Sequence, residues 1–220
     1  MTKRWKVRPE GSTWGDWGDD DQLGRVNLIT PQKVLEGVAE VKEGLSFCLS
    51  LPLNLPGGTK LNPARGPYIL RPTELPDGSI RYLYPACLDD PHFTDVGSDD
   101  RVDMVLQYAT QWDTFAHVGS MFDANGDGER DIRFYNGYQG HIDVKGPVKY
   151  NLDGTIEQTG DTTGARKLGV ENMAEKGMQG RGVLVDLERH FGETRHYVGY
   201  DDWMRALEAA NVEGTPGDML

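Results

Sequence analysis

The stretch TPQKVLEGVAEVKEGLSFCLSL, from Thr30 to Leu51, decides the class of fold that the sequence predicts. It opens like a helix, because Thr30 is a suitable N-cap and Pro31 fits the first helical position. Apolar side chains then recur along one face: Val34, Leu35, Val38 and Ala39. Gly44 follows the helix, and Leu45 to Leu51 alternate apolar with small or polar residues, as in a half-buried strand. A helix that leads into a strand predicts an α/β fold, in which helices flank a mixed central β-sheet.

Upstream of this helix, residues 1–29 are expected to form an N-terminal arm or loop. Residues 12–29 are rich in Trp, Gly and Asp and follow neither the helical nor the strand period. Trp14 and Trp17 nevertheless predict order in the arm, because an exposed indole is costly and usually docks against other side chains.

Downstream, the pattern predicts further short elements separated by turns. Prolines and glycines recur between Pro52 and Pro91, which indicates loops and hairpins, with a strand after the Asp77-Gly78 turn. The other expected elements are a strand within 101–118, a strand pair within 141–158, a helix at 170–177 and a buried strand at 182–187. Asp202 is expected to cap a last helix.

Composition limits the function classes. The formal net charge of −12 makes a nucleic-acid backbone or an anionic membrane surface a poor partner. No apolar run approaches the roughly 20 residues that span a bilayer, and the first residues lack the apolar segment of a secretory signal. We therefore expect a cytoplasmic protein. Cys48 and Cys87 lie in apolar contexts and are expected to be reduced, mostly buried thiols rather than a disulfide or a nucleophile.

The 220 residues suffice for a single domain with a core, and we expect residues 1–220 to form one. The last residues, EGTPGDML, place a turn signal at Pro216-Gly217-Asp218. Such a turn normally introduces another element. The sequence therefore predicts that a C-terminal part of the domain is missing.

MFDANGDGERD, Met121 to Asp131, resembles the start of an EF-hand calcium loop. Oxygen-bearing side chains alternate from Asp123 onward, and a glycine occupies the sixth position. The twelfth position is Phe134, where the loop needs a bidentate carboxylate. The flanking residues predict strand and loop rather than helices. A polar turn is the alternative interpretation, because Asn, Asp and Gly are the residues that turns favour.

TQWDTFAH, Thr110 to His117, carries chemistry of another kind. Asp113 and His117 are four residues apart, and a carboxylate near an imidazole is a common start for a divalent-metal or acid/base site. Taken alone, the spacing favours a structural hydrogen-bonded pair.

This segment resembles the signature of the metal-dependent cyclase family of hydrolases, which includes bacterial kynurenine formamidase and isatin hydrolase. A divergent branch carries T-Q-W-D-x-x-x-H followed by Y-N-G, and this chain has TQWDTFAH and then Tyr135-Asn136-Gly137. WGDDDQLGRVNLITPQKV and GVENMAEKGMQGRGVLVDL are similar to that branch too, so the resemblance runs from about Trp14 to Leu220. It implies the swivelling β/β/α type of fold and homo-oligomers, dimers or larger.

The resemblance assigns roles to particular residues. The family's metal-ligand Asp falls on Asp113, and its acid/base His falls on His117. The two earlier signature histidines fall on Gln107 and Gln111. An amide oxygen is a harder and weaker ligand than imidazole, so we expect manganese or loosely held zinc, with magnesium as an alternative.

Substrate-binding candidates lie around these residues. They are Trp112, Phe115, Tyr135, Asn136 and His141. The aromatic members could pack against an aromatic acyl or anilide group, although ordinary core aromatics are an equal alternative. His190 and His196 lie in a segment that indicates surface loop, and a solvated role is expected for both.

The resemblance implies hydrolysis of a C–N bond in a small amide, formamide or lactam, as in an arylformamidase that forms kynurenine from N-formylkynurenine. His117 would take a proton from water and deliver it to the departing nitrogen. Two alternatives stay open: a catalytically impaired or non-catalytic relative, and a calcium-binding module that uses Asp123 to Asp131.

Overall fold

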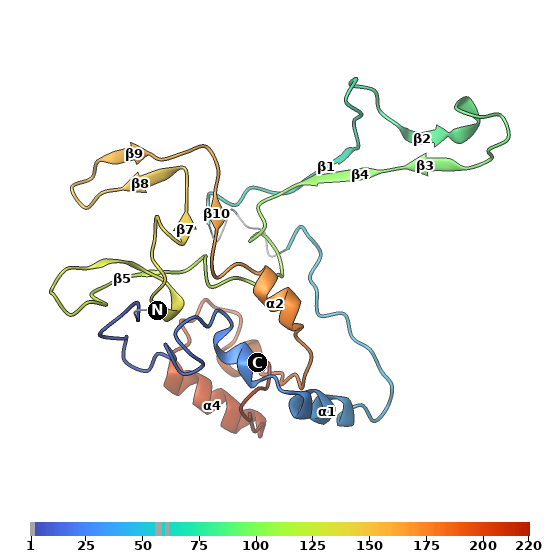
Figure 1. Cartoon of the computed structure of the whole chain (residues 1–220). Helices are drawn as coiled ribbons and strands as arrows, with labels where there is room; N and C mark the ends of the chain where they lie inside the picture. Colours follow the sequence, from blue (N-terminus) through green and yellow to red (C-terminus); the bar gives the residue numbers. More distant parts are fainter. Residues whose placement is uncertain (1–2, 56–58, 60–61) are drawn as a thin grey trace. The chain divides into compact units, whose positions relative to one another are not determined.

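The computed structural model of the chain describes residues 3–55, 59 and 62–220 (Figure 1). Part of the loop region expected after Pro52, at 56–58 and 60–61, lies outside the described residues. The chain divides into two compact units. Unit 1 comprises Met1–Leu45 and Thr114–Leu220, and unit 2 comprises Ser46–Asp113.

Unit 1 contains most of the helices and three strand pairs (Figure 1). Its helices are η1 (Gly24–Leu28), α1 (Pro31–Ala39), η4 (Tyr135–Gly137), α2 (Glu171–Lys176), α3 (Leu187–Phe191) and α4 (Tyr200–Ala210). Its strands are β5 (Ser120–Phe122), β6 (Asp131–Arg133), β7 (Val144–Lys145), β8 (Val148–Tyr150), β9 (Ile156–Gln158) and β10 (Gly164–Ala165). The pairs β5–β6, β7–β10 and β8–β9 are antiparallel.

The described residues of unit 2 form two antiparallel strand pairs and a short helix. Its elements are β1 (Ile69–Pro72), β2 (Tyr82–Pro85), η3 (Ala86–Leu88), β3 (Val96–Ser98) and β4 (Asp100–Asp103). β1 pairs with β4, and β2 pairs with β3. Among the described residues of this unit, Tyr108 is the one buried apolar side chain.

The mixture of helices and strands agrees with the expected class in its coarse form. The expected central mixed sheet, however, is absent from the described residues, whose strands form five two-stranded antiparallel sheets. No larger sheet forms among these residues because two of the expected strands lack a hydrogen-bonded neighbouring strand, apart from one isolated bridge. Residues 45–51 adopt no strand and expose their apolar side chains. In 182–187, Gly182 bridges Met219, but Leu184 is 82% exposed and α3 begins at Leu187.

Several local predictions are confirmed. The Thr30 hydroxyl caps α1 by accepting from the Lys33 N–H at 3.3 Å, with Pro31 as the first helical residue. α2 ends at Gly177, whose φ of 72° suits glycine. The strand pair expected within 141–158 is β8–β9.

The expected burial of α1 is wrong in its details. Leu35 and Val38, assigned to the apolar face, are exposed, whereas Lys33 is the buried residue of the helix. Gly37 explains the difference, because a Cβ there would lie 2.6 Å from the carbonyl carbon of Gly180. The helix therefore docks through Lys33 and Gly37, four residues apart on one face.

Two further expectations need correction. Asp202 lies at the third position of α4 rather than at its N-cap, Gly199, and its carboxylate accepts the Gly199 N–H at 3.0 Å. Cys48 and Cys87 are free, as expected, but both are exposed rather than buried. In the described part of the chain, no helix has the length and apolar character needed to cross a membrane.

The N-terminal arm docks through Trp14, as predicted, whereas Trp17 is half-buried. Trp5 and Trp14 are buried, and their rings meet edge to face with centroids 5.6 Å apart. Trp14 also packs against Phe122 of β5. A second core cluster joins Ala116, Tyr138 and Leu168. Between them, the two clusters attach the arm and the end of the TQWDTFAH segment to unit 1.

Candidate functional site

The TQWDTFAH segment passes from one unit to the other, so each part is described by itself. Gln107, Gln111, Trp112 and Asp113 belong to unit 2, and the residues from Thr114 onward belong to unit 1. That the two units together form a single domain stays a prediction.

In unit 2, the segment follows β4 and is attached through its backbone. The Gln107 carbonyl accepts from Arg65 Nη1 at 2.9 Å, and the next residue, Tyr108, is buried. After this anchor, the chain turns outward: Gln111 and Asp113 are exposed, and Trp112 is 61% exposed. The Gln111 amide, the Trp112 indole and the Asp113 carboxylate therefore lie on the surface of unit 2.

In unit 1, the segment forms a turn that is fixed by Thr114. The Thr114 hydroxyl donates to the Leu168 carbonyl, and the Thr114 carbonyl accepts from the His117 N–H at 3.1 Å. Ala116 is buried in the core cluster with Leu168, whereas the side chain of His117 is exposed. The turn thus attaches Thr114 and Ala116 to unit 1, while His117 lies at the surface.

Phe115, from the same turn, meets Tyr135 of η4. Their rings are stacked with centroids 4.7 Å apart and an interplanar angle of 25°. This juxtaposition joins two of the aromatic residues that the sequence proposes as substrate-binding. Stacked aromatic faces of this kind suit a flat apolar group.

Tyr135 is held by an acidic residue of the N-terminal arm. Its hydroxyl donates to Asp21 Oδ2 at 2.7 Å, and the Asn27 side-chain amide donates to Asp21 Oδ1 at 2.7 Å. Burial, together with the bond to Asp21, raises the pKa of Tyr135 well above its usual range. Tyr135 is therefore a protonated hydrogen-bond donor at neutral pH.

Gly24 completes this cluster and is required by its geometry. Its N–H donates to Asp21 Oδ2 at 2.8 Å, and its φ is 56°. A Cβ at this position would lie 2.9 Å from Phe115 Cζ. The sequence prediction missed Asp21, Gly24 and Asn27 as individual site residues. The signal that could have found them is the acidic run before a glycine in an otherwise aperiodic arm.

Asn136 lies beneath this cluster and is completely buried. Its side-chain oxygen accepts from the Gly15 N–H at 2.8 Å. Its amide nitrogen donates toward the carbonyls of Gly18, Asp19 and Asp21, at 3.0 to 3.1 Å. These contacts position the arm that carries Asp21, while direct contact of Asn136 with a substrate stays a prediction.

His141 is placed elsewhere in unit 1. It has a left-handed backbone, with φ of 65°, and its N–H donates to the Val144 carbonyl at 2.8 Å. With Lys145 and Arg166 it lines a polar cavity of about 390 Å³. The described residues that line this cavity include neither Phe115 nor Tyr135.

The calcium-like loop is a hairpin turn between β5 and β6. The Asp123 carboxylate accepts from the N–H groups of Gly126, Asp127 and Gly128 at 2.7 to 3.2 Å. These bonds, that from Gly128 above all, hold the pKa of Asp123 below its usual range. The loop joins strands instead of the helices that an EF-hand needs. The arrangement is that of a polar turn.

Among residues 3–55, 59 and 62–220, no group of three or more His, Cys, Asp or Glu side chains is arranged to hold a metal ion. The metal ligands expected from the sequence are one carboxylate, Asp113, and two amides, Gln107 and Gln111. With a single acidic member, they are not a group of this kind.

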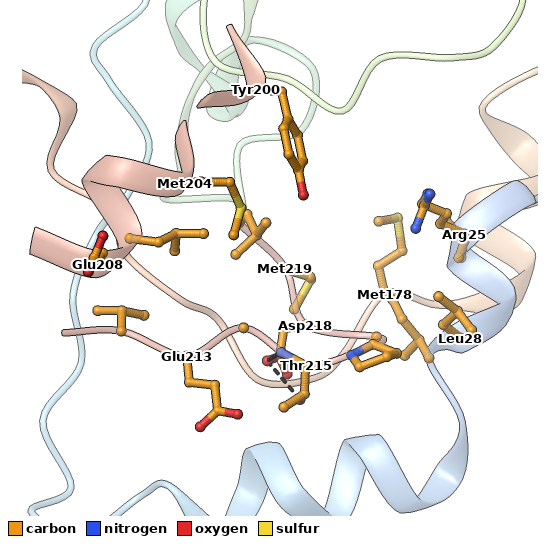
Figure 2. A pocket seen from close by; sticks show the side chains of 18 of the residues that line it. Arg25, Leu28, Met178, Tyr200, Met204, Glu208, Glu213, Thr215, Asp218 and Met219 are labelled. Carbon is orange, nitrogen blue, oxygen red and sulfur yellow. Dashed lines mark hydrogen bonds between the residues drawn. The ribbon is translucent and has the colours of Figure 1, made fainter. Parts of the chain in front are cut away.

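Another cavity, of about 960 Å³, lies where the end of the chain meets η1 and α4 (Figure 2). Its walls are mainly apolar, and Met178, Met204 and Met219 are among the side chains drawn in Figure 2. None of the residues that the sequence proposes for the site is among the described residues that line it.

A buried carboxylate, Asp218, forms part of this cavity wall with only 1% of its side chain exposed. Its oxygens lie 2.9 Å from Lys33 Nζ and 3.1 Å from Arg181 Nη1, and they accept the Thr215 N–H at 2.7 Å. Burial alone would raise the pKa of Asp218, but these partners hold it below its usual range. The ionised carboxylate attaches the end of the chain to α1.

Comparison with known proteins identifies one solved structure of particular relevance. No family model matches the chain, and no curated protein matches it. A crystal structure described as a novel cyclase is similar, with 27% sequence identity and a TM-score of 0.65. The alignment covers 96% of this chain and 61% of that one, so the chain spans about 61% of the length of that cyclase. This similarity supports the resemblance to the cyclase family that the sequence motifs predict.

Proposed function

We propose that the protein is a cyclase-family hydrolase that cleaves the C–N bond of a small amide, formamide or lactam, in the manner of an arylformamidase. The observation that carries the proposal is the similarity to a cyclase over 96% of the chain, which supports the family resemblance of TQWDTFAH. We also propose the swivelling β/β/α type of fold on the same ground.

The proposal uses residues on both sides of the boundary between the units. Asp113 belongs to unit 2 and His117 to unit 1, but they are only four residues apart in the chain. A segment of that length spans at most about 14 Å. The proposal requires both side chains to face one small substrate.

The donor set of unit 2 suits a hard divalent cation. The Asp113 carboxylate, with the amide oxygens of Gln107 and Gln111, would hold manganese, magnesium or a loosely bound zinc ion. Gln111 and Asp113 are exposed on the surface of that unit. When bound, such an ion supplies Lewis-acid polarisation of the substrate carbonyl and a more acidic water.

His117 performs the proton transfers in this proposal. Its imidazole takes a proton from the attacking water as the oxygen bonds to the carbonyl carbon. The same proton then passes to the nitrogen as the C–N bond breaks, so that an acid and an amine leave. Anchoring of the turn by Thr114 and Ala116 limits the motion of the His117 backbone during these steps.

The aromatic pair Phe115 and Tyr135 supplies the binding surface for a flat substrate. Asp21 fixes the Tyr135 hydroxyl and thereby the ring plane. Trp112, which is largely exposed in unit 2, is a further aromatic candidate. Asn136 acts through its hold on the arm that carries Asp21, and His141 is a candidate contact for a more distant part of the substrate.

The experiment is hydrolysis of N-formylkynurenine by the purified protein with added manganese. Replacement of His117 by alanine is expected to lower turnover by about 10² to 10⁴-fold, the usual contribution of a general acid/base. His190→Ala is the matched control, because that imidazole lies on α3 against Phe191 and has no role in the proposal. Equal turnover by wild type and His117→Ala would refute the mechanism.

The competing interpretation is a non-catalytic relative, favoured by the glutamines at the two signature histidine positions. It predicts no turnover by the wild-type protein with manganese, zinc or magnesium, for any of the formamide, amide and lactam substrates. It also predicts that Asp113→Ala leaves the metal content of the purified protein unchanged. The hydrolase proposal predicts metal loss in that variant.

We propose in addition that the protein forms a homo-oligomer, a dimer or larger. Unit 2 supports this, since two-stranded pairs are marginal by themselves and Tyr108 is its one buried apolar residue among those described. Leu83, Leu88 and Leu106 are each about 70% exposed, and burial of these side chains against a second copy would stabilise the unit. Light scattering should give a mass of at least twice 24.5 kDa, and a monomer would contradict this.

A further inference from the structure

The strand pair β7–β10 has two chemically different faces. Val144 and Ala165 pair with each other and both pack on the core cluster of Ala116, Tyr138 and Leu168. Side chains alternate between the faces of a strand. Their neighbours Lys145 and Arg166 therefore extend from the face that points away from that core.

On this outer face lies the polar cavity of about 390 Å³ that includes His141. Three basic residues line it, His141, Lys145 and Arg166, together with three threonines and three glycines. These remaining residues are Gly146, Thr159, Gly160, Thr162, Thr163 and Gly164. Guanidinium, ammonium, hydroxyl and glycine N–H groups are the donors that proteins use for oxyanions.

The charge of this cavity is opposite to that of the whole chain, whose formal net charge is −12. Within the described part of the chain, no carboxylate is in ion-pair contact with Lys145 or Arg166. Glu157 interacts electrostatically with His141, but its carboxylate also accepts from Asn151 at 2.8 Å and lies 3.7 Å from Lys149. The cations of the cavity therefore retain positive charge that an anion can neutralise.

Local contacts hold the cavity walls in place. The Thr159 hydroxyl donates to the Gly146 carbonyl at 2.8 Å, and the Thr159 N–H donates to the Pro147 carbonyl at 2.9 Å. The Arg166 N–H donates to the Asp143 carbonyl at 2.8 Å, which extends the β7–β10 ladder by one pair. His141 is kept in its left-handed conformation by its bond to Val144. A wall fixed in this way reduces the entropy lost when an anion binds.

We propose that this cavity binds a tetrahedral oxyanion, the phosphate group of a small metabolite. A phosphate offers oxygens in several directions, which matches donors contributed by both strands and by the loop at 159–163. A carboxylate, with two oxygens in one plane, would engage fewer of them. The volume is within the usual range of small-molecule sites and leaves room for the group that carries the phosphate. This site does not depend on the hydrolase proposed above.

The test is titration of the full-length protein with inorganic phosphate at low ionic strength, followed by calorimetry. Lys145→Gln and Arg166→Gln are each expected to weaken binding about tenfold, the usual effect of losing a charged hydrogen bond. Lys176→Gln, on α2 and outside the cavity, is the matched control and should bind like the wild type. Melting temperatures without phosphate establish that each variant is folded.

Two comparisons make the result decisive. Acetate should bind at least about tenfold more weakly than phosphate if the site selects a tetrahedral anion. Sulfate should compete with phosphate, because it presents the same oxygen geometry. The proposal is overturned if phosphate shows no binding up to about 10 mM. It is also overturned if Arg166→Gln and Lys176→Gln bind phosphate equally, since attraction would then be non-specific.

Discussion

Replacement of Asp218 by alanine should destabilise unit 1 more than any exposed acid-to-alanine change. The carboxylate is almost fully buried and has four polar partners: Lys33, Arg181, and both the N–H and the hydroxyl of Thr215. Its removal leaves two cations without their shared anion. The cost is moderated because Lys33 keeps Glu36 at 2.9 Å and Arg181 keeps Glu40 at 3.3 Å.

A magnitude follows from these contacts. Breaking a buried ion pair costs about 3 to 5 kcal/mol, and the remaining acids place Asp218→Ala near the lower end, at about 3 kcal/mol. For a chain of this size, each kcal/mol lowers the melting temperature by about 2 to 4 °C, which gives a decrease of about 6 to 12 °C. Thermal unfolding followed by circular dichroism measures it. Asp90→Ala, which removes an exposed contact with His92, is the control and should melt like the wild type.

The pH dependence supplies an independent check. The pKa of Asp218 is lower in the folded than in the unfolded protein, so the folded state binds this proton less tightly. Its stabilisation is therefore fully present above the unfolded value of about 3.9 and is lost as the pH falls through the folded value. The difference in melting temperature between wild type and Asp218→Asn should be constant near neutrality and shrink below about pH 4. A difference that grows on acidification would refute this reasoning.

Two further predictions concern the arm that holds Tyr135. Gly24→Ala combines a φ of 56° with a Cβ 2.9 Å from Phe115, and it should cost more than about 1 kcal/mol of unfolding free energy in chemical denaturation. Gly11→Ala is its control, because φ there is 69° but no atom lies within 4 Å of an added Cβ. Equal losses of unfolding free energy in the two variants would show that the contact with Phe115 contributes nothing. Asn136→Ala should release the arm, so that limited proteolysis cleaves within 15–21 faster than in the wild type. Unchanged cleavage would show that the tryptophans hold the arm without Asn136.

Local sequence signals predicted the ends of α1 and α2 and several turns, but not α3, whose residues were expected to belong to a strand end and a surface loop. Thr30 and Pro31 start α1, and Gly177 ends α2, because caps depend on residues that are neighbours in the chain. The hairpin character of the Asp123 loop also follows from local chemistry, since the carboxylate bonds to N–H groups three to five residues ahead. These features need no distant partner.

Features that depend on distant partners could not be predicted in the same way. Residues 45–51 have the alternation of a strand but no ladder partner among the described residues. The buried face of α1 is set by Gly37 against Gly180 and by Lys33 against Asp218, contacts that no periodicity records. An apolar pattern therefore identified the helix but not the side by which it docks.

The candidate site shows the same division. The TQWDTFAH segment stands out in the sequence, and similarity to a solved cyclase supports the family to which its motif points. The partner of Tyr135 did not stand out, because Asp21 lies more than a hundred residues away in an arm without periodicity. Only the fold brings the acidic run next to the aromatic pair.

Hydrolysis in water enriched in oxygen-18 tests the central proposal most directly. N-formylkynurenine is incubated with the manganese-loaded protein, and the released formate is analysed by mass spectrometry. The account predicts formate that carries one oxygen-18 atom together with the free aromatic amine, formed by wild type and His190→Ala but at least about a hundredfold more slowly by His117→Ala. Unlabelled formate, or labelled formate produced equally fast by His117→Ala, would contradict it.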